Sequence, residues 1–93
     1  MNEPHVHLFY DDGHGCLRRF GTAPLSSYGG TVPAVGDLIV EPGVARGLDR
    51  HDAANRIVHT VVARYFISGE AAHVHLVIED RPGTRLEREI LGD

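Results

Sequence analysis

Turn-forming residues interrupt this chain of 93 residues at short, even intervals. Clusters of Gly, Pro, Asp and Ser fall at residues 11–15, 26–30, 33–37, 41–43, 68–69 and 81–83. The segments between such turns suit short strands and leave little room for long helices. The spacing predicts one mostly-β domain over residues 1–93, a small curled antiparallel sheet or barrel of about five to six strands with at most one short helix.

Apolar and polar residues alternate along the predicted strands. In residues 5–10, Val6, Leu8 and Tyr10 share one face, and the two histidines and Phe9 share the other. Residues 16–22 are predicted to complete a hairpin, and residues 38–41 and 72–80 to form further strands. Residues 57–67 also fit a helical stripe, but β-branched and aromatic residues dominate there and favour a strand. Residues 84–91 fit a last strand or a short helix.

The charge balance argues against a general nucleic-acid binder. Thirteen acidic residues oppose nine basic ones, which are all arginine, so the formal net charge is −4. Domains that bind nucleic acid usually present a basic surface. A genome rich in G and C is the simplest explanation for the arginine-only set. Nucleic acid is therefore not expected as a partner.

The single cysteine indicates the compartment. Cys16 has no second cysteine to pair with, which fits a reducing environment. The first residues lack the pattern of a signal peptide, and no apolar run is long enough to cross a bilayer. The sequence predicts a cytoplasmic protein without a membrane partner.

Two segments of the chain resemble each other. Residues 5–15 read HVHLFYDDGHG and residues 73–83 read HVHLVIEDRPG, so six of eleven positions are identical. Two half-buried strands with the same alternation can converge on such a pattern, which is the simpler explanation. The other explanation is a duplication, or two strands that lie together and use their histidines jointly.

The paired histidines predict a candidate metal site. Residues i and i+2 of a strand point to the same face, so each His-x-His can grip one ion. If the two strands are neighbours, four imidazoles and one carboxylate converge, with zinc or nickel favoured by the imidazole donors. The predicted metal ligands are His5, His7, His73, His75 and Glu79, with His59 as a possible addition.

Two short resemblances to known proteins accompany these features. The order His73, His75, Glu79 resembles the ligand order early in the first motif of the cupin family. It covers seven residues, and Leu86 stands where that motif continues to a glycine, so the chain is not assigned to the cupins. The Pro-x-Val-Gly-Asp phrase at residues 33–37 resembles turns before strands in uncharacterised small bacterial barrel-like proteins of the gene-cassette kind, which implies no activity.

No catalytic set of residues is found in the sequence. Cys16 lies two residues from His14, but no third residue is evident to orient the pair. We therefore expect a non-catalytic binding or self-assembly module that forms a homodimer through a sheet edge or face. The alternatives are a metal-binding protein, including a metalloenzyme, and a small barrel that stacks single-stranded nucleic acid on aromatic side chains. The residues for that stacking are Phe9, Phe20, Tyr65 and Phe66, with Arg18, Arg19 and Arg64.

Overall fold

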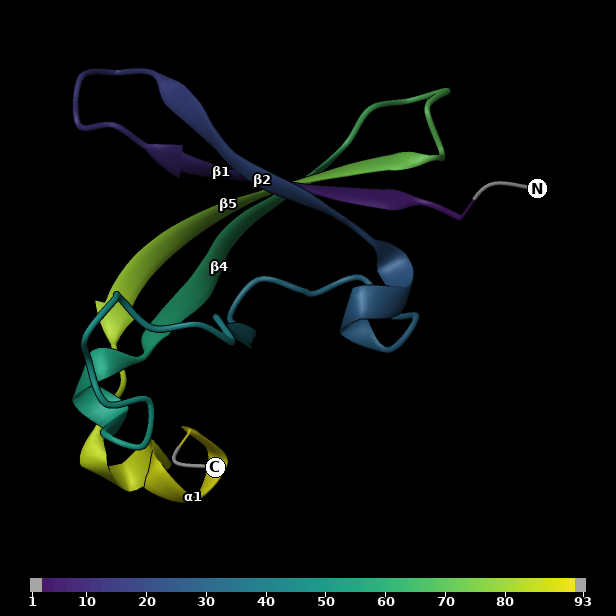
Figure 1. Cartoon of the computed structure of the whole chain (residues 1–93). Helices are drawn as coiled ribbons and strands as arrows, with labels where there is room; N and C mark the ends of the chain where they lie inside the picture. The colour runs from purple at the N-terminus through teal and green to yellow at the C-terminus, as the bar shows by residue number, and fades with distance from the viewer. Residues whose placement is uncertain (1–2, 92–93) are drawn as a thin grey trace. The chain divides into compact units, whose positions relative to one another are not determined.

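The computed structural model describes residues 3–91, whose strands form one five-stranded sheet (Figure 1). The strands are β1 (His5–Asp11), β2 (Leu17–Pro24), β3 (Leu38–Val40), β4 (Ile57–Phe66) and β5 (His73–Pro82). Residues 57–66 form a strand, as their β-branched and aromatic residues predict. Residues 85–91 are helical, a 3-10 turn at Arg85–Glu87 that continues into α1 (Arg88–Leu91). The prediction of a mostly-β fold with five strands and one short helix is confirmed.

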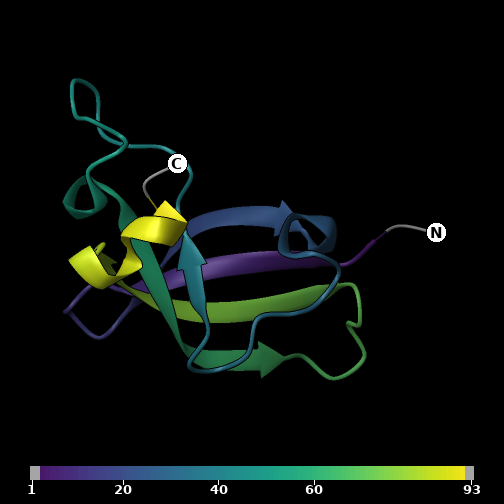
Figure 2. The ribbon, with the colours of Figure 1, turned by 90° about the horizontal axis from the view of Figure 1, so that it is seen from below.

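The strand order is β2-β1-β5-β4-β3, so the sheet has two ends and is open. The β1–β2 hairpin is antiparallel, as is the β3–β4 pair. One pairing departs from the expected antiparallel arrangement, because β1 and β5 run parallel. Parallel strands need a long connection, and most of the chain lies between these two. Figure 2 shows β1 (purple) between β2 (blue) and β5 (light green).

The two similar segments pair with each other in register. His5 lies opposite His73, and the match continues through Val6–Val74, His7–His75 and Leu8–Leu76 to Tyr10–Ile78. Four of the six identical residues therefore face their counterparts on the neighbouring strand. This arrangement agrees with the explanation in which the two similar strands lie together.

Contacts divide the chain into two compact units. Unit 1 holds residues 3–37 and Val61–Glu79, and unit 2 holds Leu38–Thr60 and residues 80–91. In unit 1, one face of the β1–β5 pair is apolar and buried, while the histidines occupy the other. The buried residues on that apolar face are Val6, Leu8, Val74, Leu76 and Ile78.

Unit 2 is built around a small apolar cluster and one buried arginine. Ala53, Val58 and Leu91 are buried together, with Val40 packed against them. Arg56 is also buried, and its guanidinium donates to the backbone carbonyls of Glu41 and Leu91. This arginine therefore links three separate segments of the unit.

An ion pair fixes the start of the C-terminal helical segment in unit 2. Both carboxylate oxygens of Glu87 accept from the Arg81 guanidinium, at 2.8 and 2.7 Å. Glu87 also accepts from the backbone N–H of Thr84, which satisfies a free donor at the helix start. These contacts, the Arg81 hydrogen bond first, lower the pKa of Glu87 to about 2.

The acidic residues at two turns act as caps. Asp11 accepts from the N–H of Gly13, and Asp12 accepts from the N–H of His14 at 2.7 Å, which is the main cause that lowers the pKa of Asp12. Asp37 accepts from the N–H of Ala34, beside Gly36 at φ 96°, a conformation that favours glycine. These three carboxylates therefore stabilise turns that the sequence predicts at residues 11–15 and 33–37.

Candidate functional site

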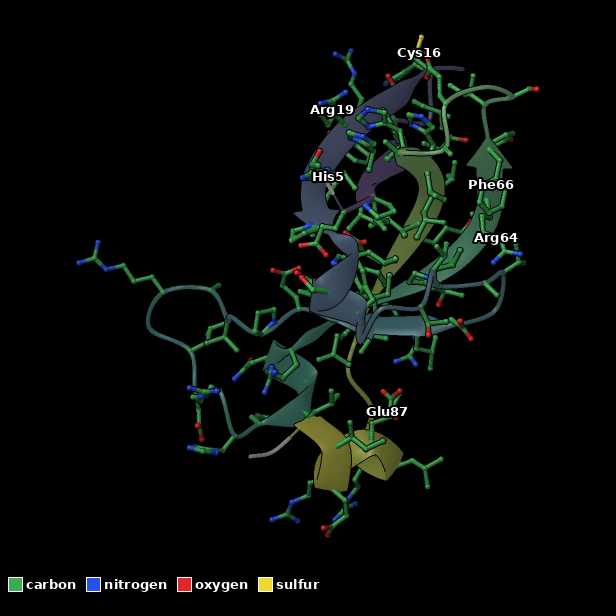
Figure 3. The ribbon with its side chains drawn as sticks, turned by 90° about the vertical axis from the view of Figure 1, so that its right-hand side faces the viewer. His5, Cys16, Arg19, Arg64, Phe66 and Glu87 are labelled. Carbon is green, nitrogen blue, oxygen red and sulfur yellow. The ribbon has the colours of Figure 1, made fainter. Side chains whose placement is uncertain are left out.

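The parallel pairing of β1 and β5 places four imidazoles on one face of unit 1. The alternation of each strand sends His5 and His7 to the same side as His73 and His75, away from the buried valines and leucines. We call these four residues the histidine face. The side chain of His5 is labelled in Figure 3 together with Arg19 of the adjacent β2.

The four rings are close to one another. His7 Nε2 lies 2.8 Å from His73 Nδ1, within hydrogen-bond distance. The centroid of the His7 ring is 5.0 Å from that of His73 and also 5.0 Å from that of His75, and the His7 and His75 rings are stacked at 17°. The His5 ring is more distant, 6.4 Å from His73. His7 is thus the centre of the group.

A hydroxyl on β2 fixes the orientation of the central ring. His7 Nδ1 lies 3.0 Å from Thr22 Oγ1, and Thr22 is the register partner of His7 in the β1–β2 hairpin. A ring that donates from Nδ1 to this hydroxyl keeps its lone pair at Nε2, where it accepts from Nδ1–H of His73. An imidazole held through its second nitrogen in this way is typical of metal ligands.

One ring nitrogen of the face is buried and has no hydrogen-bond partner. His75 Nε2 is buried and is unsatisfied within the described residues. Its ring is covered by His7 on one side and lies 5.8 Å from the ring of Phe9. The Arg19 guanidinium lies over the same phenyl ring, at 5.8 Å. A buried polar atom without a partner is costly, so a ligand that bonded this nitrogen would remove that cost.

Burial and positive neighbours disfavour the charged form of His7. Burial is the largest cause that lowers the pKa of His7 below its usual value of 6.5. The charges of His75, His73, Arg19 and His5 lower this pKa further, in that order. A neutral imidazole is the form that binds a metal ion. The environment of His7 therefore favours the ligand state near neutral pH.

This shift predicts that acid destabilises the fold. The folded chain binds a proton at His7 less readily than the unfolded chain does, so the stability that the neutral ring contributes is present above pH 6.5 and is lost as the pH falls below it. Urea unfolding followed between pH 5 and 8 should show this loss. His7→Gln should reduce the slope below pH 6.5, and His14→Gln, on an exposed turn, should leave it intact. An equal slope in wild type and His7→Gln would contradict the prediction.

The remaining predicted ligand, Glu79, does not join the four imidazoles. It lies four residues beyond His75 on β5, about 13 Å along an extended strand, and is exposed. Among residues 3–91, no group of three or more His, Cys, Asp and Glu side chains has an arrangement that could hold a metal ion. The histidine face as it stands thus offers the close pair His7–His73, with His75 beside it.

The sequence did not indicate the neighbours of His59, which lies in unit 2. Its ring is 1% exposed, and its two nitrogens face the carboxylates of Glu41 at 3.2 Å and Asp80 at 2.5 Å. Either ring nitrogen can therefore donate to the carboxylate beside it. No short motif connects these three residues, because each comes from a different segment of the chain.

No helix within residues 3–91 has the length and apolar character needed to span a bilayer.

Comparison with known proteins identifies no relative. No protein-family model matches the chain, and neither a curated protein nor a solved structure matches it.

Proposed function

We propose that this chain is a non-catalytic binding module whose histidine face takes one divalent transition-metal ion, zinc or nickel. The observation that carries the proposal is the convergence of His7 Nε2 and His73 Nδ1 at 2.8 Å, beside the buried, unpartnered Nε2 of His75. The proposal includes a bacterial cytoplasmic location, which the single cysteine Cys16 and the short resemblance at residues 33–37 support.

The close pair supplies the first two ligands. Two nitrogens bound to one tetrahedral zinc, each at about 2.0–2.1 Å, lie roughly 3.3 Å apart. The His7–His73 distance of 2.8 Å needs to widen only slightly for an ion to replace the shared proton. Imidazole nitrogens are donors that suit zinc, nickel and copper better than magnesium or calcium.

The third ligand requires a rotation of one side chain. His75 stacks on His7, so its Nε2 does not point between the other two rings, which agrees with the absence of a preformed three-ligand group in residues 3–91. Turning the ring about its side-chain torsions brings this nitrogen toward the ion and removes the cost of leaving it unsatisfied. His5 lies at the margin and is expected to contribute least.

Thr22 supports the site without touching the ion. Its hydroxyl holds Nδ1 of His7, and loss of such a supporting contact weakens metal affinity by roughly 10–100-fold. Thr22→Val keeps the shape and the β-branch but removes the hydrogen bond. Equilibrium dialysis with zinc should place the affinity of this variant in that range below wild type.

Metal binding is tested with untagged protein dialysed against zinc or nickel, followed by elemental analysis. We expect one ion per chain and a higher melting temperature with metal. The variant His73→Ala/His75→Ala should lose both effects, beyond the roughly 10–100-fold expected for a supporting residue. The matched control His14→Ala/His51→Ala removes two histidines outside the face and should behave as wild type. Retention of metal by the first variant, or its loss by the control, would overturn the proposal.

A further inference from the structure

We infer that the C-terminal half of β4 pairs with the same segment of a second copy of this chain to form a two-stranded antiparallel junction. The ladder between β3 and β4 ends at Leu38–Thr60, and the next residue, Val61, is held by backbone hydrogen bonds to Gly36 and Asp37. In the described residues β3 is the last strand of the sheet order. Residues 62–66 of β4 therefore continue beyond Val61, the last residue of β4 that is hydrogen-bonded at this edge. The backbone of residues 62–66 is open on that side.

Four of the exposed side chains at this edge are large and apolar. Val62, Tyr65, Phe66 and Ile67 are 39%, 55%, 63% and 50% exposed, in a stretch of six residues. Figure 3 shows Arg64 and Phe66 together on β4, and the Arg64 guanidinium lies 5.3 Å from the centre of the Phe66 ring. Val62 and Phe66 lie on one face of the strand and Tyr65 on the other, and large apolar side chains exposed at an open strand are typical of an interaction surface.

Strand β2 and the C-terminal half of β4 differ in how they resist pairing. Natural edge strands are protected by charges, prolines and bulges. Strand β2 has all three: Arg18 and Arg19, Pro24, and a register irregularity opposite Leu8 and Phe9. Residues 62–66 of β4 have no proline, and their one charge, Arg64, covers a phenyl ring. Pairing with another chain is thus directed to β4 and away from β2.

The segment is complementary to itself in one register. With Tyr65 on the two-fold axis, each Arg64 lies opposite Phe66 of the other copy, and Ala63 lies opposite Ile67. This exchanges the one intramolecular arginine–phenyl contact of each copy for two intermolecular contacts in the dimer and pairs two tyrosines, both favourable cross-strand combinations. With Arg64 on the axis, two like charges would face each other, which is unfavourable. The occupant of this edge is therefore a second copy in the first register.

The short pairing implies a weak dimer that forms at high protein concentration. Six residues a side bury less than the area of stable complexes, about 1,200–2,000 Å². Two copies that each carry −4 also repel, so salt should strengthen association. Sedimentation velocity in EDTA, which excludes metal bridging, should show a monomer–dimer equilibrium that shifts with concentration and salt.

Substitutions on β4 and on β2 distinguish pairing through β4 from nonspecific association. Phe66→Lys places a lysine opposite Arg64 of the other copy and should abolish the dimer, while Phe20→Lys on β2 is the matched control and should not. Circular dichroism checks that both variants keep the wild-type fold. A monomer at every concentration, or equal effects of the two variants, would overturn the inference.

A crosslink tests the register itself. Directly opposed residues have Cα atoms about 4.5–5.5 Å apart, which suits a disulfide. In a Cys16→Ser background, Tyr65→Cys should crosslink to a covalent dimer under mild oxidation, and Ala63→Cys should not, because Ala63 faces Ile67. Efficient crosslinking of Ala63→Cys, or none of Tyr65→Cys, would contradict the two-fold register.

Discussion

Replacing Leu76 with alanine should lower the free energy of unfolding by about 2–5 kcal/mol. Leu76 is 0% exposed at the centre of β5 and lies opposite Leu8 in the parallel pair. The alanine variant loses the burial of several methyl groups and leaves a cavity in unit 1 that its neighbours fill only in part. Urea unfolding at pH 7.5 measures the effect.

Leu17→Ala on β2 is the matched control for this prediction. The same chemical change is made at a side chain that is 52% exposed in the same unit, so a change within about 0.5 kcal/mol is expected. Because the backbone that Leu76 anchors also presents His75, the Leu76 variant should bind zinc more weakly than the Leu17 variant. Equal destabilisation by the two substitutions would show that the apolar face of β1 and β5 is not the core of unit 1.

Arg56→Met should destabilise unit 2 by an amount on the order of 3 kcal/mol, from the loss of hydrogen bonds made by a charged group. The guanidinium of Arg56 is buried and donates to the carbonyls of Leu91 and Glu41. Methionine keeps the apolar stem and leaves both carbonyls without their donor. Thermal unfolding, together with amide exchange near α1, measures the loss.

Arg56→Lys distinguishes the geometry of the guanidinium from its charge. Lysine retains the charge but offers one nitrogen in place of a planar fork, so it cannot reach both carbonyls as Arg56 does. We expect it to restore only a small part of the lost stability. Arg46→Met, at an exposed position in the same unit, is the control and should change stability little. Full rescue by lysine would show that the charge alone matters.

Local pattern predicted much of the fold. Residues 57–66 form a strand because their β-branched and aromatic side chains suit a pleated surface better than a helix. The sequence of residues 84–91 fits either a strand or a short helix. The contacts of Glu87 with Thr84 and Arg81 account for the helical turn that forms. The local sequence pattern does not predict that β1 and β5 pair in parallel, because the packing of the whole sheet determines which distant strands pair.

The candidate site was likewise predicted in part by local sequence pattern. Each His-x-His indicated a shared face, and in the structure His5, His7, His73 and His75 do share one. The role of Thr22 depends on the register of the β1–β2 hairpin, which a turn motif alone does not fix. Glu79 fitted the spacing of a ligand, yet an extended strand carries it away from the rings.

Imidazole nitrogen NMR during a zinc titration shows directly whether the histidine face binds one metal ion. We expect the resonances of His7 Nε2, His73 Nδ1 and His75 Nε2 to shift to metal-bound positions and to saturate at one zinc per chain. The rings of His14, His51 and His59 should keep their positions. Shifts without saturation, or shifts confined to histidines outside the face, would show that the histidine face does not bind a metal ion.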